Sequence, residues 1–290
     1  MNRGISNIQF RSWMFDIHYC SVSLQMSLVH TLKYLFPVFT DRLLFRWQQL
    51  RYFSRNRRYR REHPTTAFPA AYTLYESYQL NYRKYIEDGA LTAQEIIDSI
   101  KAYIPPTPQI LDWGCGPARI TRHLKTFCKD AFLTGCDTNT KTIQWNQDHI
   151  HTADFIVQPQ QPPLPFPDQQ FDLIICFSVF THIPAATQEI WLSELYRILK
   201  PGGILWITTH GNYFIQQLSG TEKKEISNQG IYNTPYPITG HRMMTTYHHP
   251  EKFAALLKTR FQLIAHYDGS MFPEKAGRQD LWVVRKSLNF

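Results

Sequence analysis

The sequence predicts an α/β domain with a mostly parallel sheet, preceded by a helical extension rich in arginine. Short apolar runs alternate with amphipathic stretches of helix length between residues 91 and 286, as expected for strands joined by crossover helices. A strand, a glycine-rich turn and a helix follow one another in residues 109–127. The predicted parts are a basic, partly amphipathic extension, 1–62, a tyrosine-rich segment, 63–90, and a main domain, 91–290, with an insertion at 212–246.

Composition separates the extension from the main domain. The chain of 290 residues has a net charge of +8, and residues 42–61 contain eight arginines and no acid, which equals the whole excess. A hydrophobic fraction of 43% is enough for a large core. Five cysteines without framework spacing predict reduced thiols and a cytoplasmic location rather than disulfides or a zinc site.

The extension contains an apolar stretch, Cys20–Phe39, which polar residues and a proline interrupt. It lacks the run of about 20 apolar residues that a membrane span needs, and no signal-peptide cleavage pattern follows a short apolar run. Met14 and Met26 are alternative starts. The sequence does not show whether residues 1–62 are folded.

Residues 42–53 are predicted to form a basic amphipathic helix. Leu43, Leu44, Trp47 and Leu50 recur at helical spacing, with Phe53 as a further candidate, and arginines lie on other faces. Three interpretations stay open for it. The helix packs its apolar stripe on the main domain, or it lies on an anionic membrane surface as a peripheral contact, or it binds nucleic acid, which is the least favoured.

A tight turn after the first predicted strand is suited to a ligand. Gly114 and Gly116 let the backbone approach a ligand closely, and Pro117 fits the first turn of a helix. Arg119 stands where the dinucleotide fingerprint has its third glycine. Asp112 would repel a pyrophosphate but suits a cationic ligand.

The run Asp112-Trp-Gly-Cys-Gly-Pro resembles motif I of the class I S-adenosylmethionine-dependent methyltransferases, and Leu164–Asp168 and Leu199–Gly203 resemble two further patterns of that family. The resemblance implies a Rossmann-like, seven-stranded, mostly parallel sheet with an antiparallel last strand. It also implies S-adenosylmethionine as cofactor; separately, the sequence shows no metal-ligand pattern, so no metal is predicted. The cofactor-binding residues it implies are Asp112, Gly114, Cys115, Gly116, Asp137, Thr138, Gln160, Phe177 and Ser178.

The spacing supports one of these positions, Asp137, and another, Gln160, departs from the family pattern. Asp137 follows the second predicted strand, about 20 residues after the glycine turn, where an acid accepts hydrogen bonds from ribose hydroxyls. One of the next two residues can cap the following helix, which leaves Asp137 free. Gln160 aligns with an adenine-binding aspartate of the family, and its amide accepts without charge.

The tyrosine-rich segment is predicted to place five tyrosines on one face of a helix, Tyr72–Tyr85. By resemblance it is a lid over the cofactor, with Tyr75, Tyr78 or Tyr82 toward the ligand; plain packing is the alternative. The next helix is predicted over 91–103, with Thr92 and Glu95 as its capping box. The other predicted elements are helices 117–127, 141–149, 186–199 and 250–258, strands 131–136, 155–157, 171–177 and 204–208, a final antiparallel pair 261–267 and 280–285, and an irregular polar insertion 212–246.

Two histidines are candidates for a general base, which a hydroxyl acceptor would need. His182 follows the fourth predicted strand and His210 the fifth; for His182 the alternative is to brace the next helix. The histidines at 241, 248 and 249 lack acidic or thiol partners at metal-ligand spacing. Neither an Asn/Asp-Pro-Pro-Tyr motif nor a Pro-Cys pair follows the fourth strand, which disfavours adenine, glutamine and cytosine C5 acceptors.

The sequence therefore predicts a methyltransferase that acts by direct displacement on an oxygen, or a nitrogen, of a small metabolite, lipid or sugar. Two alternatives stay open. One is an RNA-modifying methyltransferase that uses the Arg42–Arg61 segment, and the other is an inactive cofactor-binding module. The identity of the acceptor and the oligomeric state are not predicted.

Overall fold

The computed structural model describes residues 37–234 and 244–287. The chain forms two compact units, residues 1–51 and 52–290. The predictions for the stretch Cys20–Phe39 and for the alternative starts therefore lie almost wholly outside the described residues, as does His241. Across 37–234 and 244–287, none of the helices combines the length and the apolar character that crossing a bilayer requires.

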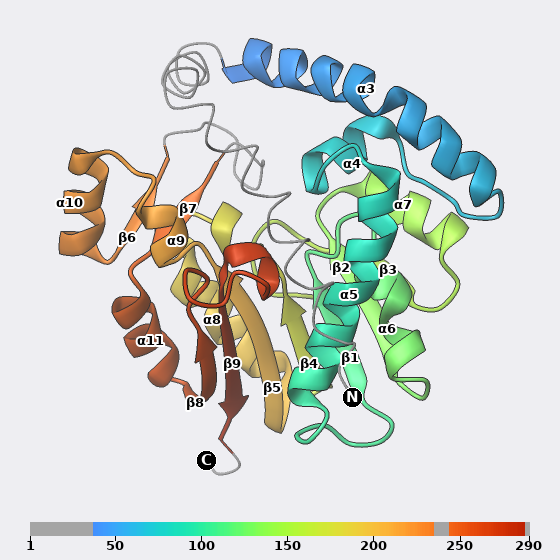
Figure 1. Ribbon diagram of the computed structural model, residues 1–290. Helices are drawn as coiled ribbons and strands as arrows, with labels where there is room; N and C mark the ends of the chain where they lie inside the picture. The colour runs from blue at the N-terminus through green and yellow to red at the C-terminus, as the bar shows by residue number, and fades with distance from the viewer. Residues whose placement is uncertain (1–36, 235–243, 288–290) are drawn as a thin grey trace, which may run out of the picture. The chain divides into compact units, whose positions relative to one another are not determined.

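A seven-stranded sheet forms the centre of residues 52–290 (Figure 1). Its strands are β1 Gln109–Trp113, β2 Phe132–Asp137, β3 Asp154–Val157, β4 Phe171–Cys176, β5 Leu199–Thr209, β8 Phe261–Tyr267 and β9 Asp280–Lys286. Their order is β3-β2-β1-β4-β5-β9-β8. The first five are parallel, and β9 runs antiparallel to both β5 and β8. The predicted fold class is confirmed.

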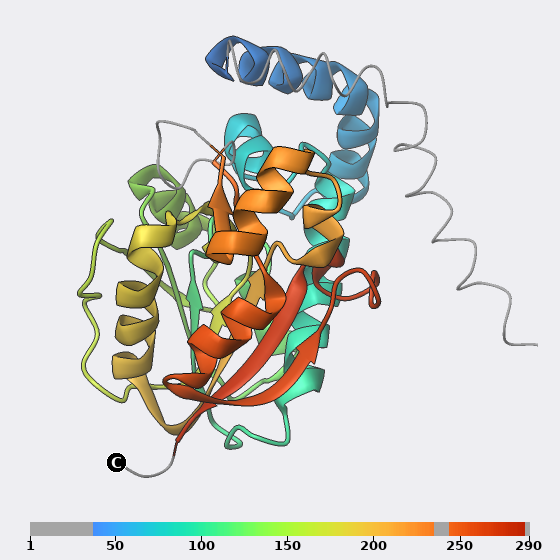
Figure 2. The same ribbon diagram turned by 90° about the vertical axis from the view of Figure 1, so that its left-hand side faces the viewer.

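Helices join the strands and cover both faces of the sheet. They are α3 Pro37–Glu62, α4 Ala71–Ser77, α5 Tyr82–Ile100, α6 Thr121–Phe127, α7 Thr140–His149, α8 Ala185–Ile198, α9 Asn212–Ile215, α10 Gly220–Gln229 and α11 Pro250–Lys258, with short 3₁₀ turns η1 Phe180–His182 and η2 Ala276–Arg278. The core side chains of α5 and α6 pack on one face, and those of α8 and α11 pack on the other. Figure 2 shows α8 and α11 from the side that they cover.

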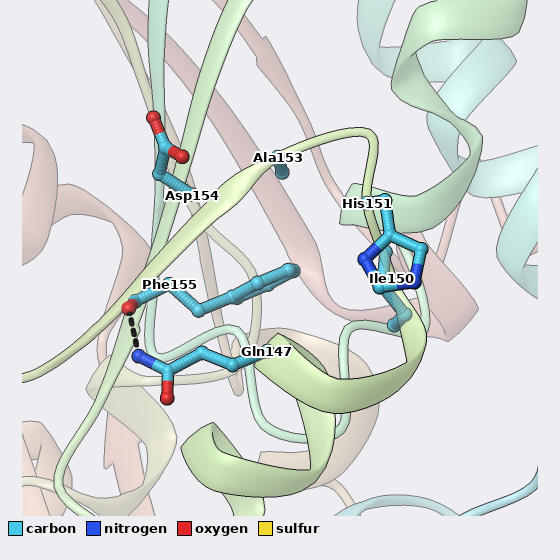
Figure 3. Close-up of a pocket in the computed structure, with 6 residues that line it drawn as sticks. All are labelled: Gln147, Ile150, His151, Ala153, Asp154 and Phe155. Atoms are coloured by element: carbon cyan, nitrogen blue, oxygen red, sulfur yellow. Dashed lines mark hydrogen bonds between the residues drawn. The ribbon is translucent and has the colours of Figure 1, made fainter.

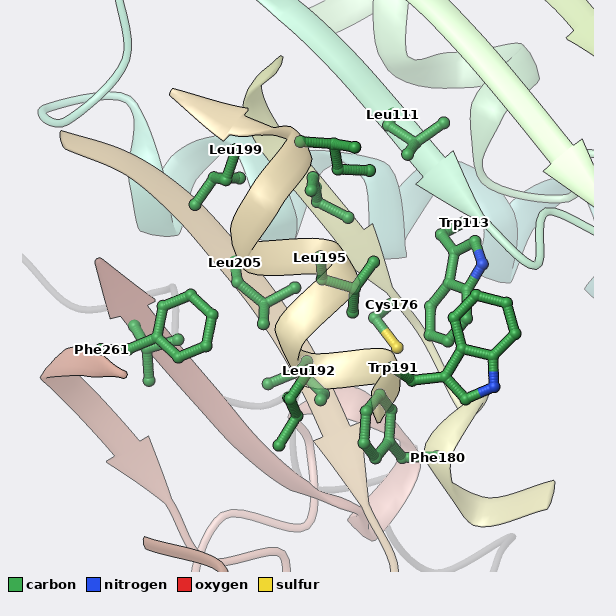
Figure 4. Close-up of a cluster of buried hydrophobic side chains, with 14 of the residues drawn as sticks. Leu111, Trp113, Cys176, Phe180, Trp191, Leu192, Leu195, Leu199, Leu205 and Phe261 are labelled. Carbon is green, nitrogen blue, oxygen red and sulfur yellow. The ribbon is translucent and has the colours of Figure 1, made fainter. Parts of the chain in front are cut away.

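The α8 face holds the larger aromatic part of the core (Figure 4). Leu192 and Leu195 of α8 are fully buried beside Cys176 of β4 and Leu205 of β5. Trp191 packs on Trp113, the last residue of β1, with ring centroids 4.8 Å apart. Burial of each leucine stabilises the fold by about 2 kcal/mol. This packing fixes the ends of β1 and β4, where the candidate site lies.

Residues 63–103 differ from the prediction at two places. The helix predicted from residue 91 begins at Tyr82, with Asn81 as its N-cap, whose side chain accepts from the backbone N–H of Lys84. Thr92 is therefore not a cap: it lies inside α5 and donates to Asp88 O at 2.7 Å. The tyrosines do not share one helix, because the chain leaves the helical conformation between α4 and α5.

The insertion at 212–246 is not irregular as predicted. It contains α9, α10 and a hairpin of β6 Ile231–Asn233 and β7 Thr246–His248. Ser219 and Glu222 form a capping box at the start of α10, and Gly230 ends it with φ +83°. The pattern Ser219-x-x-Glu222 was a usable sequence signal for this helix.

Several other boundaries agree with the sequence. Helix 250–258 and strand 261–267 begin and end as predicted. Asn139 is the N-cap of α7 and accepts from Thr142 N at 3.1 Å, which confirms that Asp137 is not the cap. Helix α6 is shorter than predicted and begins at Thr121, because Ala118 adopts φ +53°, which no α-helix accommodates.

Candidate functional site

The glycine turn lies at the carboxyl end of β1, at the centre of the parallel part of the sheet. Gly114 has φ +73° and Gly116 has φ +50°, in the left-handed region that favours glycine. The N–H groups of Gly114 and Cys115 both donate to Cys136 O, at 2.8 and 3.0 Å, and so tie the turn to β2. A Cβ on Gly114 would lie 2.5 Å from Val179 Cγ2, so this position excludes any side chain.

The two predicted aspartates lie on either side of this turn. Asp137 accepts from Gly116 N at 3.0 Å and from Asn139 N at 2.8 Å, and burial raises its pKa. Asp112 is 3% exposed and accepts from Thr121 Oγ1 at 2.5 Å. Burial raises the pKa of Asp112 to about 6. A cationic ligand beside these carboxylates would offset the cost of burying their charge.

In the loop after β3, Gln158 lies against the end of β2 and was not among the predicted site residues. Gln158 is buried, its N–H donates to Asp137 O at 3.0 Å, and its Oε1 lies 2.9 Å from Cys136 Sγ. Gln160 is exposed in the same loop, as is Thr138 after β2. Neither has a hydrogen bond to the glycine turn within the described chain, so their proposed contacts stay predictions.

The exit of β4 has a strained conformation. Ser178 adopts φ +61°, which is unusual for a residue with a side chain and often marks a functional site. Its N–H donates to Thr208 Oγ1 at 2.8 Å, and its Oγ accepts from Gln279 Nε2 at 3.0 Å. Phe177 stacks on Trp206 with ring centroids 5.9 Å apart. The structure therefore places Phe177 and Ser178 at the carboxyl ends of the parallel strands, where the glycine turn also lies.

Arg119 belongs to this site and was not among the predicted site residues. It is 9% exposed, and its guanidinium lies 4.5 Å from the Tyr78 ring and 5.2 Å from the Phe177 ring. Its side chain makes one hydrogen bond within the described residues, to Thr92 Oγ1 at 3.4 Å. Burial lowers the pKa of Arg119, but a guanidinium stays charged and keeps five donors. The one sequence feature that could have indicated Arg119 is its position, where the dinucleotide fingerprint has its third glycine.

Tyrosines from α4 and α5 cover the glycine turn from one side. Tyr85 donates to Pro117 O and accepts from Arg122 at 3.1 Å. Tyr78 donates to Asp88 at 2.6 Å. Tyr75 is fully buried, and its ring centroid lies 5.9 Å from that of Tyr72.

Tyr82, the third tyrosine predicted for the lid, lies farther along. It stacks on Phe68, with centroids 4.1 Å apart, and accepts from Arg60 at 2.9 Å. These are contacts with the preceding segment of the chain. A Cβ on Gly116 would lie 3.6 Å from Ser77 Cβ, so the end of α4 lies directly against the turn.

The two candidate histidines lie at the carboxyl ends of neighbouring strands. His182 Nδ1 is 2.7 Å from Met244 O, which joins it to the insertion. His210 has a buried Nδ1 without a hydrogen-bond partner in the described parts of the chain, and its ring lies 4.1 Å from that of Phe214. Burial, with contributions from His182 and His248, lowers the pKa of His210 well below 6.5. Both side chains therefore face the same region of the site.

His248 supports this region and gives a stability prediction. Its side chain is 1% exposed, its Nε2 is 2.9 Å from Gln188 Oε1, and burial lowers its pKa to about 3. In the unfolded chain His248 binds a proton below about pH 6.5, whereas in the folded chain it does not. The free energy of unfolding therefore decreases as the pH is lowered below about 6.5. Between pH 7.5 and 5, His248 is expected to contribute a loss of about 2 kcal/mol.

The measurement is urea unfolding of the wild type and of His248→Gln at both pH values. The wild type should lose about 2 kcal/mol more than the variant. His151→Gln, at an exposed histidine, is the matched control and should behave like the wild type. Equal losses in all three proteins would show that His248 does not titrate as described.

The site residues above lie at the carboxyl ends of the parallel strands. Comparison with known proteins of similar fold indicates what such a site does. Residues 111–207 match the family model described as a methyltransferase domain. A solved S-adenosylmethionine-dependent methyltransferase from Methanosarcina mazei has the same fold, with a TM-score of 0.52 and 21% identity over 66% of this chain and 98% of that one. The family model and the shared fold together support a class I S-adenosylmethionine-dependent methyltransferase.

Curated relatives of this methyltransferase act on different acceptors. The tRNA N(3)-cytidine methyltransferase of Gallus gallus is 27% identical over 38% of this chain and 32% of its own length. The malonyl-[acyl-carrier protein] O-methyltransferase of Erwinia billingiae is 31% identical over 38% of this chain and 42% of its own length. The chain thus matches less than half the length of these relatives, and the match does not identify the acceptor.

The site fits S-adenosylmethionine, the cofactor of this methyltransferase. The glycine turn offers bare backbone, and the buried carboxylate of Asp112 and the half-buried carboxylate of Asp137 suit a cation. The unused donors of Arg119 suit a carboxylate. A pyrophosphate would instead face two acids. Within residues 37–234 and 244–287, no group of three histidines, cysteines or acids is arranged to hold a metal ion.

A separate cavity lies at the other end of the sheet (Figure 3). It measures about 360 Å³ and is lined by residues at the end of α7 and the start of β3, among them His151 and Asp154. Gln147 Nε2 donates across its floor to Phe155 O at 2.7 Å. The start of β3 lies at the amino ends of the parallel strands, whereas the glycine turn lies at their carboxyl ends. This cavity is therefore not part of the methyltransferase site.

Proposed function

We propose that this methyltransferase transfers a methyl group to an oxygen, or a nitrogen, of a small metabolite, lipid or sugar. When bound, S-adenosylmethionine supplies a methyl group that its sulfonium has already activated. The chain's residues must then orient the acceptor, exclude water and take up a proton where the acceptor is a hydroxyl. The four described cysteines are all free, which supports the proposed cytoplasmic location.

The orientation of His182 is the observation that carries the hydroxyl acceptor. Met244 O can only accept a hydrogen bond, so His182 Nδ1 is the donor. In the neutral imidazole, Nε2 then has the lone pair that removes a proton. A base held by a backbone carbonyl at the end of β4 has the arrangement expected of a general base. We propose His182 as this base and His210 as a second, neutral contact to the acceptor.

The test is the activity of His182→Gln on the hydroxyl acceptor. We expect kcat to fall by roughly 10²- to 10⁴-fold, the usual contribution of a general base, while the affinity for S-adenosylhomocysteine stays unchanged. For His210→Gln we expect a rise in KM with a smaller loss of kcat. His151→Gln is the control at an exposed histidine. Full activity of His182→Gln across the pH range would contradict a base at this position.

The acceptor itself is found by incubating the protein with labelled cofactor and a cell extract. We expect the label in the small-molecule or lipid fraction. RNA is the second candidate, because eight arginines lie between residues 42 and 61 and one relative is a tRNA methyltransferase. Label in RNA, lost when those arginines are replaced, would establish that alternative and overturn the small-molecule proposal.

We also propose roles for Arg119 and for residues 63–90. Arg119 would hold the carboxylate of the cofactor, since its buried guanidinium has donors without a partner in the described structure. Residues 63–90 would act as the lid. Tyr78 lies on Arg119, Tyr85 donates to the glycine turn, and Ser77 lies against Gly116. Closing over the cofactor would exclude water from the reacting groups.

A further inference from the structure

The described part of the first unit, residues 37–51, presents an apolar stripe to solvent. Phe39, Leu43, Trp47 and Leu50 follow one another at intervals of four, four and three residues, so they share one face of α3. Their exposed fractions are 67%, 59%, 52% and 81%. Large apolar side chains gathered on one exposed face mark an interaction surface.

The second half of α3 belongs to the second unit and makes its own contacts there. Tyr52 donates to Gln79 Oε1 at 3.3 Å, Asn56 Nδ2 donates to Leu80 O at 3.2 Å, and Tyr59 is buried. None of these contacts involves a residue of the apolar stripe.

Positive charge surrounds the apolar stripe. Helix spacing places Arg46 on one side of it and Arg51 on the other, and the Arg51 guanidinium lies 4.7 Å from the Trp47 ring centroid. Residues 42–61 contain eight arginines and no acid, so this segment carries a large positive charge. A binding partner that suits both the charge and the apolar stripe offers negative charge and an apolar layer.

We propose that α3 binds the surface of an anionic phospholipid bilayer, with the apolar stripe among the acyl chains near the headgroups and the arginines at the phosphates. RNA would satisfy the arginines, but its bases stack on aromatic rings and leave Leu43 and Leu50 exposed. This binding goes beyond methyl transfer and does not depend on it. It would bring the methyltransferase to a membrane surface.

The test is flotation of the full chain with vesicles of phosphatidylcholine, with or without phosphatidylglycerol. We expect binding to the anionic vesicles to exceed binding to neutral ones by about tenfold or more, and to weaken with salt. The double variant Leu43→Glu/Leu50→Glu should lose about tenfold in binding. Leu91→Glu is the matched control, because Leu91 is also 59% exposed but lies on α5. Binding of S-adenosylhomocysteine should be the same in all three proteins and reports their folding.

Three outcomes would overturn the proposal. The double variant binds anionic vesicles as well as the wild type does. The wild type binds neither kind of vesicle at low salt but binds an RNA oligonucleotide. The wild type is a dimer that the double variant makes monomeric, without any vesicle binding, which would show that a second copy covers the apolar stripe.

Discussion

Replacement of Asp137 with alanine is expected to lower the affinity for S-adenosylhomocysteine by about 100-fold or more. A buried carboxylate that accepts from two ribose hydroxyls contributes about 1.5–3 kcal/mol through each hydrogen bond. Asp137 also accepts from Gly116 N at 3.0 Å, so its loss loosens the glycine turn as well. Both effects act in the same direction on cofactor binding.

Calorimetry with S-adenosylhomocysteine measures this effect. Asp137→Asn keeps one acceptor oxygen without the charge and should lie between the wild type and Asp137→Ala. Asp154→Ala is the matched control, because Asp154 is an exposed acid at the opposite end of the neighbouring strand. If Asp137→Ala binds within about threefold of the wild type, the proposed ribose contact is wrong.

Features with a strong local signal were predicted well. Pro250 in the first turn fixed the start of α11, and Asn139 was one of two residues predicted to cap α7. The positive φ of the glycine turn and the place of Asp137 at the end of β2 also agree with the sequence, because both depend on nearby residues. In each case the deciding interaction joins residues close together in the sequence.

The errors in α5 and in the insertion have different causes. Thr92 and Glu95 match a capping box, but packing against α6 extends the helix back to Tyr82. Gly89 lies against the turn that precedes α6, since a Cβ there would lie 2.2 Å from Arg119 O. The insertion, by contrast, had its own capping signal, which its many polar residues and turn residues concealed.

The chemistry of the site was less predictable than its location. The base proposal for His182 depends on a hydrogen bond to Met244, which is 62 residues away in the sequence. Arg119 is proposed as a site residue because the Tyr78 and Phe177 rings contact it from two separate segments. Neither contact has a local pattern. Sequence could name residues at the ends of strands, but only the fold shows which atoms of those residues face one another.

The second large effect is expected at Arg119. Arg119→Met should weaken S-adenosylhomocysteine binding by roughly 10- to 100-fold, the value of a charge-assisted hydrogen-bonded pair. The same variant should bind the decarboxylated analogue of S-adenosylhomocysteine almost as well as the wild type does. Comparing both proteins with both compounds is a double-mutant cycle across protein and ligand. It isolates the interaction between Arg119 and the ligand carboxylate, because the two compounds share every other contact.

Arg122→Met is the matched control for this cycle, since Arg122 lies three residues further along, in α6, and bonds to Tyr85 rather than facing Phe177. It should leave the preference for the carboxylated compound intact. If Arg119→Met instead leaves both affinities unchanged and raises the KM of the acceptor, the guanidinium binds a carboxylate on the acceptor. That result would indicate that the acceptor carries a carboxylate. The role of Arg119 would then be recognition of the substrate rather than binding of the cofactor.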